Sequence, residues 1–265
     1  MRRGGWFPLV CGLMTLAALA LVGSNVAVIA VRGLKSLPAC LVQPEVRFAL
    51  GLSVKSACVS TVLCFLLAAP TAYTLTRTAL PGRRAAEMVL ELTMSLPYIV
   101  LGLSMLILFS SPAGKWLKEA GFPVVFHQNG VILAQLVVNL PFAVRLCAAA
   151  FRGVDRKLEC TAGLLGASPA QQFFTVLLPL SKNALISAVI LVWSRALGEF
   201  GATLMLVGVT RMKTETLPGS IYLAVSTNNL DAALASAFLL LVLSALSLTA
   251  ASLLGRSGEK RSRYV

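Results

Sequence analysis

The sequence has few charged residues and almost none of the side chains that carry catalytic or metal chemistry. Only 12% of its 265 residues are charged, 57% are hydrophobic, and His127 is the single histidine. No C-x-x-C pair is present, so the usual ligands of a zinc site are missing, and no G-x-x-x-x-G-K-S/T motif is present to bind ATP. We therefore expect no metal site, no bound cofactor and no catalytic residues, and a chain that does not itself hydrolyse ATP.

The cysteines do not follow the pattern of a disulfide scaffold. Only Cys40 falls in a segment expected outside the cell, and Cys160 falls in a loop expected inside it. The other four lie within apolar stretches: Cys11, Cys58, Cys64 and Cys147. We expect all six thiols to be free.

Long apolar segments account for most of the chain, whose mean hydropathy is +0.84. A bilayer core about 30 Å thick takes about 20 apolar residues per helix, and backbone groups in lipid must be paired within the helix. Six such segments are present, at residues 7–31, 54–76, 88–109, 130–150, 184–207 and 230–254. We predict an all-α membrane protein with one transmembrane domain over residues 1–265. The first segment is longer than a signal-peptide core, so we expect it to be an uncleaved span.

The positive charge also has the distribution of a membrane protein. The 23 basic residues lie beside the apolar segments rather than in one stripe, which argues against a nucleic-acid partner. With the N-terminus inside, thirteen fall on the cytoplasmic side: Arg2, Arg3, Arg77, Arg83, Arg84, Arg152, Arg156, Lys157, Lys182, Arg256, Lys260, Arg261 and Arg263. Seven fall outside: Arg32, Lys35, Arg47, Lys115, Lys118, Arg211 and Lys213. This excess predicts a multi-pass protein of the cytoplasmic membrane with both termini in the cytoplasm.

The longest predicted cytoplasmic loop, residues 151–183, has the signals of two short helices joined by a turn. Asp155 can cap the first helix, and Gly166 can end it in a left-handed conformation. Ser168 followed by Pro169 is a typical helix start. The loop also displays four large apolar side chains: Leu164, Leu165, Phe173 and Phe174. Exposed apolar groups of this size indicate a partner surface.

The end of this loop resembles a known family. Gly166, nine residues and then Val176-Leu177-Leu178-Pro179 are similar to the end of the EAA loop in permease subunits of ABC importers. Glu159 is the only acidic residue near the position of the family's glutamate, which Cys160 occupies here. The resemblance implies a type I ABC importer permease fold and a loop that docks in a groove of the ATPase. The coupling residues it implies are Glu159, Cys160, Thr161, Ala162, Gly166, Ser168, Pro169, Phe173 and Pro179.

Further motifs resemble molybdate and tungstate permeases. They are Pro81-Gly82-Arg83-Arg84, Leu96-Pro97, Leu140-Pro141-Phe142, the run from Arg195 to Thr203, and Glu215-Thr216-Leu217-Pro218 with Ile221-Tyr222. The resemblance implies import of molybdate or tungstate, with sulfate or thiosulfate as the alternative. It also implies a homodimer in membrane lipid, two ATPase chains that use ATP and Mg, and a periplasmic or extracellular oxyanion-binding protein.

Two charges within the fifth apolar segment are candidates for the pathway or its gate. Arg195 and Glu199 are four residues apart, so in a continuous helix they would share a face and pair. Such a pair has either a structural or a functional role. Their neighbours Gly198, Gly201 and Thr203 complete the candidate set. A gradient-driven carrier using Glu199 and a scaffold that only docks a partner are the other hypotheses, although no inverted repeat is visible.

Overall fold

The computed structural model describes residues 6–262, with side chains placed up to Leu253, and this part of the chain contains helices and no β-strand. The predicted all-α fold is confirmed. Among the basic residues used to predict topology, Arg2, Arg3 and Arg263 lie outside the described residues. The side chains of Arg256, Lys260 and Arg261 lie outside the described part as well.

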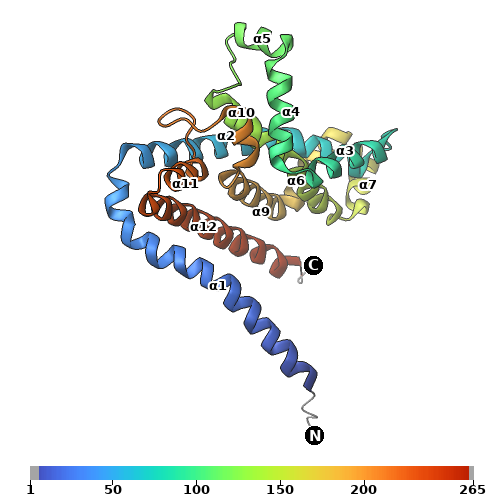
Figure 1. The fold of residues 1–265 in the computed structure, drawn as a ribbon. Coiled ribbons are helices and arrows are strands. Elements are labelled where there is room, and N and C mark those ends of the chain that lie inside the picture. The colour runs from blue at the N-terminus through green and yellow to red at the C-terminus, as the bar shows by residue number, and fades with distance from the viewer. Residues whose placement is uncertain (1–5, 263–265) are drawn as a thin grey trace.

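The helices follow one another with short connections (Figure 1). Their bounds are α1 Trp6–Leu41, α2 Pro44–Arg77, α3 Arg83–Ser95, α4 Tyr98–Ser110, α5 Pro112–Glu119, α6 Gln128–Arg152, α7 Arg156–Leu164, α8 Pro169–Gln172, a π-helical turn Phe173–Leu177, α9 Leu178–Leu197, α10 Gly201–Val207, α11 Leu217–Ser226 and α12 Leu230–Ser262.

Five helices of the described chain are long and apolar enough to cross a membrane: α1, α2, α6, the helix from Pro169 to Leu197, and α12. A sixth span results if α3 and α4 count as one, but these two helices are bent by 110°. The predicted span 88–109 is therefore not a single straight helix. Pro97 has no N–H and disfavours the helical conformation at the residue before it, and Leu96 is accordingly extended with φ −74° and ψ 142°.

The predicted span 184–207 is also interrupted, because α9 ends at Leu197 and α10 begins at Gly201. Towards the loop of residues 151–183, by contrast, α8, the π-helical turn and α9 form one continuous helix. Pro179 has no N–H and so cannot make the α-helical hydrogen bond at its position. Next to it, the N–H of Leu178 bonds to the carbonyl of Phe173, five residues earlier, which is the π-helical pattern. The loop expected over residues 151–183 is thus largely helical.

The core lies where α2, α6 and α9 pack together. Small buried side chains such as Ala68, Ala72 and Cys147 let α2 and α6 approach closely, and Phe151 fills the end of this cluster. In contrast, the N-terminal half of α1 projects away from the other helices (Figure 1), and none of its most apolar window is buried. Near its other end, Gly33 packs directly on α12. The interior is thus built mainly by residues 44–253, and α1 joins it only near its end, where Gly33 packs on α12 and Cys40 is buried.

Candidate coupling and translocation site

The predicted cytoplasmic loop contains a compact structure of residues 156–172, which we name the α7–α8 unit. The Asp155 carboxylate accepts a hydrogen bond from the backbone N–H two residues later at 2.9 Å and so caps α7. Gly166 follows with φ +90°, a conformation that favours glycine. Ser168 and Gln171 form a reciprocal capping box at the start of α8. The predicted cap, turn and restart are confirmed.

The tip of the α7–α8 unit is apolar and open. Leu164 is 90% exposed and Leu165 is 85% exposed, and Phe174 in the following π-helical turn is 64% exposed. Two adjacent leucines exposed to water at the tip of a turn are unfavourable, and burying them against another surface would lower the free energy. The tip therefore has the character of a contact surface.

Two of the expected coupling residues are turned inward and fix the unit to the membrane helices. Phe173 is half-buried and packs edge-to-face on Tyr73 and Phe151, with ring centres 5.2 and 6.0 Å apart. Glu159 is buried and forms an ion pair with Arg77 at the end of α2, with 2.8 Å between Oε1 and the guanidinium. Arg77 also donates a hydrogen bond to the Phe151 carbonyl at 2.6 Å. These residues position the unit rather than forming its outer face.

The remaining expected coupling residues lie at or near the surface. Ala162 is half-buried, and the others are exposed: Cys160, Thr161, Gly166, Ser168, Pro169 and Pro179. The exposed surface of the unit is therefore the turn and one side of α7. On the opposite side, Glu159 and Phe173 contact α2 and hold the unit in place.

Arg195 and Glu199 bind different partners. Arg195 donates a hydrogen bond to the Tyr98 hydroxyl, and its guanidinium carbon lies 5.0 Å from the centre of the Phe142 ring. Glu199 is buried and accepts a hydrogen bond from the Ala202 N–H at 2.8 Å, capping α10. The ion pair expected from their spacing is not among those of the described residues. The reason is that α9 ends two residues before Glu199, so the two side chains no longer share a helix face.

Close packing holds α10 against α4. A Cβ added at Gly201 would lie 3.3 Å from Cβ of Tyr98, and one added at Gly102 would lie 2.6 Å from the Ala202 carbonyl oxygen. Thr203 is buried in the same contact region of α10. Gly102 was not predicted, because a single glycine in an apolar run carries no signal until its neighbour is known.

A buried glutamine stabilises the break between α9 and α10. Gln135 on α6 donates hydrogen bonds to the Ala196 carbonyl at 3.0 Å and to the Ser56 hydroxyl at 3.2 Å, and accepts one from Ser60 at 3.1 Å. Gly198, which is exposed, then ends α9. An amide within an apolar span was the available signal for Gln135, and Asn139 in the same span carries the same signal, since buried polar groups in membranes are costly.

On the side predicted to be extracytoplasmic, Glu215 is a third buried carboxylate, only 3% exposed. Burial raises its pKa, while the Met212 N–H and the positive charge of Arg211 act in the opposite direction. The next residue, Thr216, caps α11 by accepting a hydrogen bond from Gly219. This segment orders the connection between α10 and α11.

The described residues contain no cluster of three or more histidine, cysteine, aspartate or glutamate side chains suited to a metal ion. All six cysteines are free, as expected from their positions.

Comparison with known proteins places these features in a family. Residues 61–260 match the family described as "Binding-protein-dependent transport system inner membrane component". The chain is 39% identical over 210 residues to the molybdenum transport system permease protein ModB of Mycobacterium tuberculosis, covering 78% of this chain and 79% of that protein. It is 30% identical over 267 residues to the sulfate transport system permease protein CysW of Escherichia coli K12, covering 98% and 92%.

Among solved structures, the chain resembles an inward-facing methionine ABC transporter, MetNI. The TM-score is 0.66 at 19% identity, and the match covers 81% of this chain and 96% of that one. The predicted type I importer permease fold is confirmed. The chain belongs to the binding-protein-dependent transport system inner membrane component family and is a multi-pass membrane protein.

Proposed function

We propose that this chain is the membrane subunit of an ATP-driven importer that translocates molybdate or tungstate across the cytoplasmic membrane. It works as a homodimer with two copies of an ATPase subunit, which uses ATP and Mg, and with an external oxyanion-binding protein. The greater identity to a molybdenum permease (39%) than to a sulfate permease (30%) supports this choice of substrate. The chain itself holds no cofactor, and both termini face the cytoplasm.

One observation carries the proposal: a continuous helix joins the two parts of the candidate site. The helix from Pro169 to Leu197 has 29 residues, so it is about 44 Å long at about 1.5 Å per residue. The apolar tip at Leu164 and Leu165 lies at one end, and the break before α10 lies at the other. A displacement of the α7–α8 unit by a partner therefore moves the end of α9 as a rigid lever.

The break supplies the gate. Gly198 ends α9, and Glu199 and Gly201 let α10 begin in a new direction against α4. Arg195 is held by the Tyr98 hydroxyl, so its charge is fixed at the end of the lever. Together with Thr203, these residues form a gate in which a dianion meets few positive charges and is released readily.

The test is uptake of labelled molybdate by proteoliposomes holding the assembled complex and the binding protein. We expect uptake that requires ATP. Leu164→Asp with Leu165→Asp should abolish both ATPase co-purification and uptake, because charged side chains cannot enter an apolar groove. The matched control, Leu164→Met with Leu165→Met, should retain both. A gradient-driven carrier would transport without ATP, and a scaffold would not transport at all.

Sulfate is the second candidate substrate, favoured by the match to CysW over 98% of the chain. The same vesicles distinguish the two. Unlabelled tungstate should suppress molybdate uptake at concentrations at which sulfate does not. Equal suppression by sulfate would assign the chain to sulfate import instead.

A further inference from the structure

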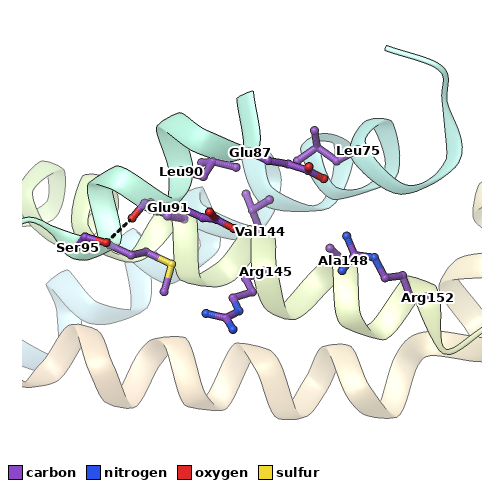
Figure 2. Close-up of a pocket in the computed structure, with 11 residues that line it drawn as sticks. Leu75, Glu87, Leu90, Glu91, Ser95, Val144, Arg145, Ala148 and Arg152 are labelled. Atoms are coloured by element: carbon purple, nitrogen blue, oxygen red, sulfur yellow. Dashed lines mark hydrogen bonds between the residues drawn. The ribbon is translucent and has the colours of Figure 1, made fainter. Parts of the chain in front are cut away.

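A cavity of about 540 Å³ lies between α3 and α6, towards the end of α6 that leads into α7. Its charged lining residues are Glu87 and Glu91 on α3 and Arg145 and Arg152 on α6. Figure 2 shows Glu91 reaching from α3 towards α6, with Arg145 and Arg152 spaced along α6. Arg152 lies seven positions after Arg145, which is about 10 Å, or two helical turns, along α6. The cavity is thus a charged, partly open site in which Arg145 and Arg152 are exposed, and it is distinct from the break between α9 and α10.

The two arginines have no carboxylate bound to them. The ion pairs of the described residues are Arg77 with Glu159 and Arg83 with Glu87, at 2.8 and 3.0 Å. Arg145 lies in a segment apolar enough to span the membrane, where an unpaired charge is costly unless it faces water or an anion. An anion entering the cavity would provide the missing partner.

We infer that this cavity is an inner station for a tetrahedral oxyanion, in which Arg145 and then Arg152 contact the anion on its way to the cytoplasm. The inference rests on the proposed function. Guanidinium groups bind oxyanions by paired, charge-assisted hydrogen bonds. A phosphate group of an anionic lipid has the same chemistry, so the test must separate the two sources.

The opposite wall keeps the contact weak. Glu91 lines the same cavity as the arginines and repels a dianion, while Glu87 is already paired with Arg83. The volume of about 540 Å³ also leaves room for water around the anion, so its hydration shell need not be removed. A station of this kind attracts the anion and still releases it.

The experiment reads the charge of the cavity directly. Ser95, which lines the cavity, is replaced by cysteine in an otherwise cysteine-free chain, and the whole complex is reconstituted in phosphatidylcholine vesicles. The rates of modification by an anionic and a cationic methanethiosulfonate are then compared. We expect Arg145→Gln to lower the anionic-to-cationic rate ratio about tenfold, as loss of one charged hydrogen-bonding group implies. Arg145→Lys should keep the ratio, as should Arg84→Gln, an exposed α3 control outside the lining.

Molybdate should slow modification of Ser95→Cys in the Arg145 protein and not in Arg145→Gln. The same vesicles should show at least about tenfold slower ATP-driven uptake for Arg145→Gln. Protection by added phosphatidylglycerol but not by molybdate would assign the cavity to lipid and overturn the inference. An unchanged rate ratio in Arg145→Gln would overturn it too. Failure of the wild-type complex to import anion would instead count against the proposed function.

Discussion

Two buried carboxylates at opposite ends of the same helical lever are stabilised in different ways. Glu159, in the α7–α8 unit, pairs with Arg77, which is 82 positions earlier in the chain. Glu199, at the break, has an arginine only four residues away and binds a backbone N–H instead. Glu159 is therefore held by a buried ion pair between distant elements, and Glu199 by a hydrogen bond from a backbone N–H three residues later.

This difference has a mechanical meaning. An ion pair that joins α2 to α7 fixes the α7–α8 unit to the core, so under the proposed function a displacement of the unit would also displace the helices it is fixed to. The Glu199 cap lies within the turn between α9 and α10, so a change of angle between these helices would not have to separate an ion pair at Glu199. The rigid end suits contact with a partner, and the adaptable end suits a gate.

The largest expected effect comes from breaking the pair at the rigid end. Arg77→Ala leaves the Glu159 carboxylate buried without its partner, and we expect a loss of about 3–5 kcal/mol in the free energy of unfolding. Denaturation of the purified protein in mixed micelles measures it. Arg77→Met with Glu159→Leu should be less destabilised than either single change. If Arg77→Ala unfolds like the wild type, the α7–α8 unit is not held by this pair.

Local features near the α7–α8 unit were predictable from the sequence, whereas the partners of buried charges were not. The cap at Asp155, the left-handed Gly166 and the restart at Ser168 depend on residues within one or two turns of each other, and the structure has them all. The inward turn of Glu159 depends on where α2 ends relative to α7. Nothing in the local sequence specifies that distance.

The membrane helices show the same limit. The apolar runs predicted where the long apolar helices lie, since hydropathy averages over many residues, although only five of the six expected spans are single unbent helices. The 110° bend at Pro97 was missed because a proline in a membrane helix often causes only a kink. At the break after Leu197, the Gln135 amide binds the Ala196 carbonyl and comes from another helix, so the local sequence does not show this contact. Pairing of Arg195 with Glu199 failed as a prediction because it assumed an unbroken helix.

A smaller effect is expected at the adaptable end. Glu199→Ala removes the cap of α10 and should cost about 1 kcal/mol in the free energy of unfolding. Combined with Arg195→Gln, its effect should be additive within about 0.5 kcal/mol, because the two side chains have separate partners. The same cycle on Arg77 and Glu159 is the matched control and should show strong coupling. Strong coupling between Arg195 and Glu199 would restore the ion pair that their spacing suggests.

The smallest effect sharpens the comparison with a third buried carboxylate, Glu215, which has neither an ion pair nor a place on the lever. Burial raises its pKa above the usual value of about 4.3 in an unfolded chain. The folded state therefore binds this proton more tightly than the unfolded state, so its contribution to stability falls as the pH rises from about 4.3 through the folded pKa and is constant above it.

Glu215→Gln cannot ionise, so it should match the wild type at the acid end of this window and become the more stable protein above it. Micelle denaturation across the pH range measures the difference, and Glu119→Gln, a change at an exposed carboxylate, should show none of it. A wild type that gains stability relative to Glu215→Gln as the pH rises would mean that Arg211 and the Met212 N–H outweigh burial, and that Glu215 belongs with Glu159 among the carboxylates stabilised by charge.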